Sequence, residues 1–188
     1  MKRISLDELF RRAVDVLERE RVPYLVYGGM ALPAWGEVVT TEDIDFVVQV
    51  REESAARLVR GLREAGFQVP PSAEATLFID AWFVASLEGR EVDFALGATE
   101  FDESALERAV RVRLYERTVP IATAEDLILY KLAAYRPKDL VHVRDIVLRQ
   151  GARLDCVYLR GWARRIAEAT GKFEIPGTLE QVLSEQGL

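Results

Sequence analysis

The run Asp43–Val50, DIDFVVQV, constrains the fold more than any other segment of the chain. Its apolar residues favour a buried strand, on which residues two apart point to the same face. Asp43 and Asp45 therefore present their carboxylates side by side. At about 5.5 Å and an effective dielectric near 20, the two charges repel by about 3 kcal/mol. A bound cation would remove this cost, so the run predicts a site for Mg²⁺ or Mn²⁺, which prefer carboxylate oxygens.

Length and composition indicate a soluble globular chain. With 188 residues, 49% of them hydrophobic and 30% charged, the chain is expected to fold as one domain, or as one domain with a small appendage. No apolar run is long enough to span a membrane, and the acidic N-terminal stretch does not resemble a secretory signal. We therefore expect a cytoplasmic protein without a membrane partner. The single Cys156 and the single His142 exclude a Cys/His zinc site, and we assign no chemistry to His142.

The first part of the chain is predicted to alternate between helices and strands. A capping box at Ser5 opens a helix, and β-forming residues precede Gly28 and Gly29. In chain order we expect a helix over 5–21, a strand over 23–27, a short helix over 30–35, a strand over 43–50, a helix over 52–65 and a strand near Phe67.

Further along, strands give way to helices. A hairpin is expected over 82–87 and 91–96, then a helix over 103–110 and strands over 112–115 and 118–121, whereas the helices that follow are 123–136, 138–150, 155–169 and 179–185. The predicted class is α/β (α+β): a small mixed sheet with flanking helices, followed by an all-helical C-terminal part. We expect an α/β core over 1–122 and a helical subdomain over 123–188.

Two further features join the Asp43–Asp45 pair. The Gly28-Gly29 turn leads from a strand into a short helix, which exposes backbone N–H groups to an anion such as phosphate, although an ordinary turn would have the same sequence. Asp93 lies between Val92 and Phe94, so alternation aims its carboxylate away from the layer that its neighbours face.

Together these residues resemble a known signature. Tyr27-Gly28-Gly29, Asp43-Ile44-Asp45-Phe46 and Val92-Asp93-Phe94 are similar, in order and spacing, to the nucleotidyltransferase motif of the DNA polymerase β superfamily. The stretches 41–45, 124–132 and 136–140 also resemble the small bacterial AbiEii-type nucleotidyltransferases, over about 24–146. This resemblance implies metal at the acidic pair, phosphates at the glycine turn, and a helical Lys131 and Asp139 that help to hold the nucleotide. Relatives often carry arginine where this chain has Val39.

The expected reaction moves a nucleoside monophosphate from an NTP, such as ATP, to an acceptor hydroxyl, with release of pyrophosphate. Asp93 either completes the metal site or accepts the hydroxyl proton. The predicted catalytic and metal-binding residues are Asp43, Asp45 and Asp93, and the predicted nucleotide-binding residues are Gly28, Gly29, Thr41, Lys131 and Asp139.

The acceptor is left open between RNA, a protein and a small molecule. The span Lys131–Arg165 holds nine basic and three acidic residues, which favours a polyanion such as RNA. One alternative is a catalytically weak or inactive nucleotide- or RNA-binding module of the same fold, either alone or as part of a toxin–antitoxin pair. Another is a structural protein whose acidic pair has no function. Nothing in the sequence fixes the nucleobase preference or the oligomeric state.

Overall fold

The computed structural model describes residues 3–36 and 41–188. The chain divides into two compact units. The first contains Met1–Met30 and Thr40–Ile121, and the second contains Ala31–Val39 and Ala122–Leu188. The domains expected from the sequence, 1–122 and 123–188, stay a prediction.

A six-stranded mixed sheet forms the centre of the first unit, in the order β3-β4-β2-β1-β6-β5. β2 and β4 are parallel neighbours, as are β1 and β6, whereas the other neighbouring pairs are antiparallel. The predicted α/β class with a mixed sheet is confirmed. The strands are β1 Tyr24–Tyr27, β2 Ile44–Val48, β3 Trp82–Leu87, β4 Arg90–Leu96, β5 Val110–Leu114 and β6 Arg117–Ile121.

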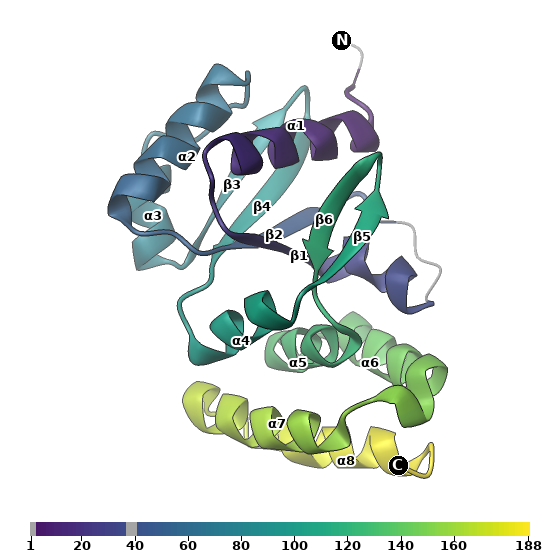
Figure 1. Cartoon of the computed structure of the whole chain (residues 1–188). Helices are drawn as coiled ribbons and strands as arrows, with labels where there is room; N and C mark the ends of the chain where they lie inside the picture. The colour runs from purple at the N-terminus through teal and green to yellow at the C-terminus, as the bar shows by residue number, and fades with distance from the viewer. Residues whose placement is uncertain (1–2, 37–40) are drawn as a thin grey trace. The chain divides into compact units, whose positions relative to one another are not determined.

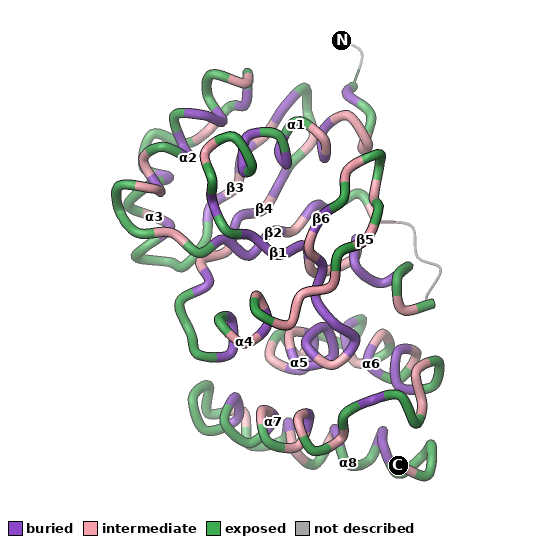
Figure 2. Tube along the Cα trace, in the orientation of Figure 1, coloured by how far each residue is buried: buried purple, intermediate pink, exposed green. Residues whose placement is uncertain are grey.

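Aromatic rings make the core on one face of this sheet. Phe46 on β2 and Phe94 on β4 are register partners with stacked rings, and Phe83 on β3 stacks on Phe94 at 5.0 Å between ring centroids. Phe10 on α1 (Leu6–Arg19) stacks on Phe46 at 5.9 Å. Helix α1 therefore covers this face (Figure 1), and the central strands are the most continuously buried part of the unit (Figure 2).

Three other helices belong to the first unit: α2 Glu52–Glu64, α3 Ala73–Ile79 and α4 Glu100–Arg108. The sequence prediction missed α3. It also placed α4 three residues too late, because Thr99 and not a later residue caps the helix. The strand expected near Phe67 is a single bridge between Gln68 and Ser86.

The second unit is helical, which confirms the predicted all-helical C-terminal part. Its helices are α5 Ala124–Ala134, α6 Pro137–Gln150, η2 Gly151–Arg153, α7 Cys156–Thr170 and α8 Glu174–Ser184, and the 3₁₀ helix η1, Gly28–Trp35, enters it from the first unit. The Trp35 indole donates to the Ala122 carbonyl at 3.0 Å, and the Gln150 amide donates to the Trp35 carbonyl at 2.9 Å. Throughout residues 3–36 and 41–188, helices long and apolar enough to cross a membrane are absent.

Candidate active site

Asp45 and Asp93 leave the same face of the sheet. They are register partners on the parallel strands β2 and β4, one position before the Phe46–Phe94 pair, so their side chains point away from the aromatic core. Asp43 lies one residue before β2 and, by the same alternation, on the side of Asp45. The sheet thus brings together the three acids that the sequence predicted, with Asp45 and Asp93 half-buried and Asp43 exposed.

The Asp93 carboxyl is half-buried and lies near other negative charges. Burial raises the pKa of the Asp93 carboxyl above its usual value, and the negative charges of Asp43 and Glu91 raise it further. The charge of Asp43 thus acts on the Asp93 carboxyl across the acidic face. Burial and the neighbouring negative charges therefore destabilise the ionised form of the Asp93 carboxyl.

The glycine turn lies directly against this acidic face. Gly28 has φ +65°, and a Cβ built on it would overlap the Asp45 carboxylate, with Cγ at 2.7 Å. A Cβ on Gly29 would lie 2.6 Å from Thr41 Oγ1. Cβ atoms essentially never approach other heavy atoms closer than 3.0 Å, so a side chain at either position would displace Asp45 or Thr41, and the backbone conformation of Gly28 also favours glycine. Four residues of the predicted site are thus adjacent.

Thr41 braces the segment in front of β2. Its Oγ1 accepts a hydrogen bond from the Asp43 backbone N–H at 3.2 Å and donates to the Asp43 carbonyl at 3.3 Å. Thr41 is a predicted nucleotide-binding residue, and in the structure its hydroxyl organises the backbone of the first acid.

Sequence reasoning missed Glu42 and Arg90. Arg90 Nη1 lies 3.5 Å from Glu42 Oε2, and Arg3 Nη1 lies 3.4 Å from the same oxygen. The available signal was that each of these two residues lies close to a predicted acid, Glu42 beside Asp43 and Arg90 three residues before Asp93. A pocket of about 340 Å³ opens here, lined by Arg3, Glu42, Asp43, Ser86, Gly89, Arg90 and Glu91.

The acidic face suits a hard divalent cation by its chemistry. Within the part of the chain that the structure describes, His, Cys, Asp and Glu side chains do not form groups of three or more that could hold a metal ion. Mg²⁺, however, commonly takes only one or two carboxylates and completes its shell with substrate phosphates and water. The pair Asp43 and Asp45, with the repulsion that raises the pKa of Asp93, fits that requirement.

Lys131 and Asp139 lie in the second unit, on α5 and α6. Both are buried, and Lys131 Nζ lies 3.4 Å from Asp139 Oδ1 and 3.0 Å from His142 Nδ1. Burial alone would raise the pKa of Asp139, but hydrogen bonds from Arg136 and the charge of Lys131 hold it below its usual value. Burial and the charge of Lys131 lower the pKa of His142. His142 is therefore a partner of Lys131, a role that the sequence did not reveal.

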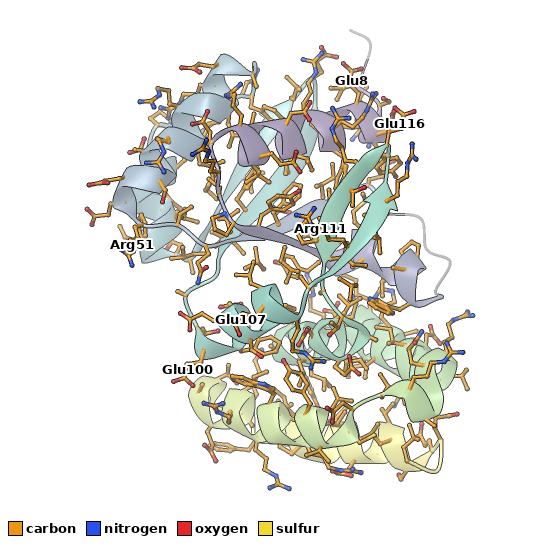
Figure 3. All side chains as sticks on the ribbon, viewed as in Figure 1. Glu8, Arg51, Glu100, Glu107, Arg111 and Glu116 are labelled. Atoms are coloured by element: carbon orange, nitrogen blue, oxygen red, sulfur yellow. The ribbon has the colours of Figure 1, made fainter. Side chains whose placement is uncertain are left out.

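A larger pocket of about 550 Å³ lies at the opposite end of β1, near its first residue, Tyr24. The Tyr24 hydroxyl donates to Glu18 Oε1 at 3.3 Å. Glu107 on α4 and Arg111 on β5 also line the pocket, and both are labelled in Figure 3. None of the predicted site residues lines this pocket, so it is separate from the acidic face.

The sequence model of the aminoglycoside-2''-adenylyltransferase family matches residues 9–128, which contain the glycine turn and all three acids. The chain belongs to this family. It is therefore a nucleotidyltransferase, as the motifs predicted. A search of curated proteins found no match.

Solved structures share the family fold. The solution structure of the antibiotic-resistance factor ANT(2'')-Ia is 18% identical, with a TM-score of 0.61 over 89% of this chain and 96% of that one. The crystal structure of ANT(2'')-Ia in complex with adenylyl-2''-tobramycin is also 18% identical, with a TM-score of 0.60 over 85% and 97%. JHP933 from Helicobacter pylori is 14% identical, with a TM-score of 0.50 over 96% and 91%. At these identities the likeness concerns the fold alone.

Two sequence predictions are not tested by these matches. The AbiEii-type resemblance stays a prediction, since the family that matches is that of the aminoglycoside-2''-adenylyltransferases. Val39, where relatives often carry arginine, lies outside the described residues.

Proposed function

We propose that this protein transfers AMP from ATP to a hydroxyl group of an aminoglycoside. The observation that carries the proposal is the acidic face of β2 and β4, with Asp43, Asp45 and Asp93 on one side of the sheet and the Gly28 turn packed against Asp45. Membership of the aminoglycoside-2''-adenylyltransferase family supports the choice of acceptor and of nucleotide.

In the proposed reaction the acceptor oxygen attacks the α-phosphorus of ATP. A new O–P bond forms, the bond between the α-phosphorus and its bridging oxygen breaks, and pyrophosphate leaves with that oxygen. The hydroxyl proton passes to Asp93. A carboxyl whose pKa lies above the usual value holds a transferred proton better than an ordinary aspartate, and both burial and like charges raise the pKa of Asp93.

The other residues bind and orient the nucleotide. Backbone N–H groups at Gly28 and Gly29 face the β and γ phosphates, because a strand that turns into a helix at glycines leaves such groups open to an anion. Asp43 and Asp45 would hold Mg²⁺ or Mn²⁺, which, when bound, neutralises charge on the phosphates and lowers the pKa of the attacking hydroxyl. A role of Lys131 and Asp139 in nucleotide binding, predicted from the sequence, stays a proposal.

Charge around the acidic face favours a cationic acceptor. In addition to the three acids, the neighbouring pocket contains Glu42 and Glu91, against the basic residues Arg3 and Arg90. Glu42 and Glu91 are balanced by Arg3 and Arg90, so the negative excess comes from the three acids alone, and in the absence of metal it attracts cations. RNA, predicted from the basic span Lys131–Arg165, is the competing acceptor, and the experiment below distinguishes the two.

The test supplies ATP labelled at the α-phosphate, Mg²⁺, and in separate reactions a mixture of aminoglycosides or total tRNA. We expect label in the aminoglycoside and none in RNA, and no transfer by Asp43→Asn. Asp80→Asn, which alters an exposed acid at the end of α3, should transfer as wild type. Label in tRNA alone would refute the aminoglycoside acceptor, and undiminished transfer by Asp43→Asn would refute the site.

The binding-module alternative predicts a different result. Such a protein, alone or in a toxin–antitoxin pair, would bind ATP in calorimetry and release no pyrophosphate with any acceptor. Release of pyrophosphate that depends on the aminoglycoside would exclude it.

A further inference from the structure

We propose that Arg90 is a positioning residue that fixes Asp43 through Glu42. The inference rests on the proposed function for the role of Asp43, but the contacts that carry it belong to the first unit alone. It assigns a task to an arginine that lies outside the glycine turn and the acidic motifs.

Asp43 lacks the support that the other two acids have. Asp45 and Asp93 lie within the ladder between β2 and β4, whereas β2 begins at Ile44, one residue after Asp43. The Thr41 hydroxyl forms hydrogen bonds with the Asp43 backbone N–H and carbonyl. An exposed residue at the end of a strand needs other contacts to keep a fixed place, because strand ends fray more readily than strand centres.

Arg90 supplies such a contact by extending the ladder. It is the first residue of β4, and the register that pairs Ile44 with Val92 places Glu42 beside Arg90 when it is continued two residues back. The backbone pairing of β2 and β4 starts at Ile44 and Val92. Two residues earlier, the two chains are still joined, by the ion pair at 3.5 Å between the side chains of Arg90 and Glu42.

The Arg90 side chain is itself held in place. Its Nε donates to the Ile4 carbonyl at 2.8 Å, in front of α1, and the side chain is 16% exposed. The planar guanidinium fork allows one arginine to serve both partners with little loss of freedom. Arg3, which also meets Glu42, is 56% exposed and makes the weaker anchor. Glu42, itself 60% exposed, thus has an anchored partner at 3.5 Å, and we infer that this contact restrains the backbone of the acid next to it.

The consequence is that one strand positions two acids. β4 carries Asp93 within the ladder and holds Asp43 through the Arg90–Glu42 pair. Residues that hydrogen-bond directly to a metal ligand commonly change metal affinity or activity by about 10- to 100-fold when they are removed, and for Arg90, which acts through the neighbour of Asp43, we expect the lower end of that range.

The first experiment measures amide hydrogen exchange over residues 41–46 in protein without metal or nucleotide. We expect faster exchange in Arg90→Gln than in wild type, with an intermediate rate in Arg90→Lys, which keeps the charge and loses the fork. Arg60→Gln is the control for the loss of an arginine charge, because Arg60 pairs with Glu64 at 3.9 Å on α2, away from residues 41–46, and both side chains are exposed. Exchange in Arg90→Gln that equals the Arg60→Gln control would overturn the proposal.

The second experiment uses Mn²⁺ titration of the same proteins. We expect about tenfold weaker binding in Arg90→Gln. Glu42→Gln should give a similar loss, and the double variant should be no worse than either single variant, because both remove one interaction. Losses that add in the double variant would show that Arg90 does not act through Glu42, and would overturn the inference.

Neither measurement needs ATP or an acceptor, so the two proposals fail separately. Faster exchange and weaker Mn²⁺ binding in a protein that transfers no AMP would support the role of Arg90 and refute the proposed function. If the wild-type protein transfers AMP but Arg90→Gln leaves amide exchange and Mn²⁺ affinity unchanged, the proposed function is supported and the role of Arg90 is refuted. If Arg90→Gln fails to fold, Arg90→Lys and Glu42→Gln carry both tests.

Discussion

The carboxylate of Asp45 occupies the space that any side chain at position 28 would need. A Cβ on Gly28 would overlap Asp45 Oδ2 and lie 2.7 Å from Cγ. The glycine turn and the acidic pair of the proposed site are therefore in direct contact, and a side chain cannot be added at position 28 without moving Asp45.

Gly28→Ala tests this contact. The left-handed backbone at φ +65° costs an alanine about 1–2 kcal/mol, and the added methyl displaces Asp45 as well. Since a displacement of about 1 Å in an active site costs about a hundredfold in rate, we expect a loss of that order in AMP transfer. Gly171→Ala has the same backbone strain, at φ +71°, with nothing within 4 Å of the new Cβ. It should lose stability and keep activity; equal activity losses in both variants would contradict the steric explanation.

Thr41→Val tests the brace on Asp43. The substitution preserves shape and removes the hydroxyl that bonds to the Asp43 N–H and carbonyl. A neutral hydrogen bond contributes about 1 kcal/mol, which corresponds to about fivefold in kcat if the loss falls on the transition state. Thr41→Ser keeps the oxygen and should remain close to wild type. If the valine and serine variants had the same kcat, the hydroxyl would have no positioning role.

Asp93→Asn should increase stability while it abolishes transfer. The folded-state pKa of Asp93 is raised, so the folded protein binds this proton more tightly than the unfolded chain does. Stability is therefore lost as pH rises from the unfolded pKa of 3.8 through the folded value. In metal-free protein we expect a higher Tm than wild type at pH 7.5, and no difference below about pH 4.

The kinetic half of that prediction is a fall in kcat of at least about a hundredfold, because an amide cannot accept the proton. Glu88→Gln, in the exposed turn between β3 and β4, is the control for removal of a nearby charge. An Asp93→Asn variant that is less stable than wild type at neutral pH would show that the carboxylate is held by favourable contacts.

The Lys131–Asp139 pair makes a prediction about the second unit. Asp139→Leu leaves Lys131 as a buried charge without its carboxylate, which costs about 3 kcal/mol in the free energy of unfolding. Because the pKa of Asp139 is lowered, this contribution is present above pH 3.8 and disappears as pH falls through the folded-state value. Adding Lys131→Met should recover most of the stability in denaturant titrations.

The same double variant separates structure from nucleotide binding. If Lys131 and Asp139 contact ATP as proposed, a stable Lys131→Met/Asp139→Leu protein binds ATP more weakly in calorimetry. Unchanged ATP affinity would assign the pair to stability alone. Glu8→Gln, which removes one partner of an exposed pair with Arg12 on α1, should change neither quantity appreciably.

Local patterns in the sequence account for much of the candidate site. Alternation on two strands predicted that Asp45 and Asp93 each point away from their apolar neighbours, and the two glycines predicted a turn. What the sequence could not show is that β2 and β4 are parallel neighbours, because β3 and two helices separate them along the chain. The partnership of Arg90 with Glu42 depends on that long-range pairing and was therefore missed.

The errors in the fold have local causes. Helix α3 has only 7 residues, and its apolar residues Phe78 and Ile79 are exposed. The sequence therefore lacks the apolar stripe from which a helix could be predicted. Helix α8 begins at Glu174, five residues before the prediction, because Pro176 lies in its first turn. A proline there breaks no hydrogen bond, since first-turn N–H groups have no partner within the helix.

The shared register of β2 and β4 also determines which changes in length the protein tolerates. An insertion or deletion of one residue within β4, ahead of Asp93, would turn its carboxylate toward the aromatic rings and bring Phe94 to the acidic face. Point substitutions leave that alternation intact. In a library of variants we therefore expect insertions and deletions to survive in the connecting loops, while the spacing within this strand pair stays fixed.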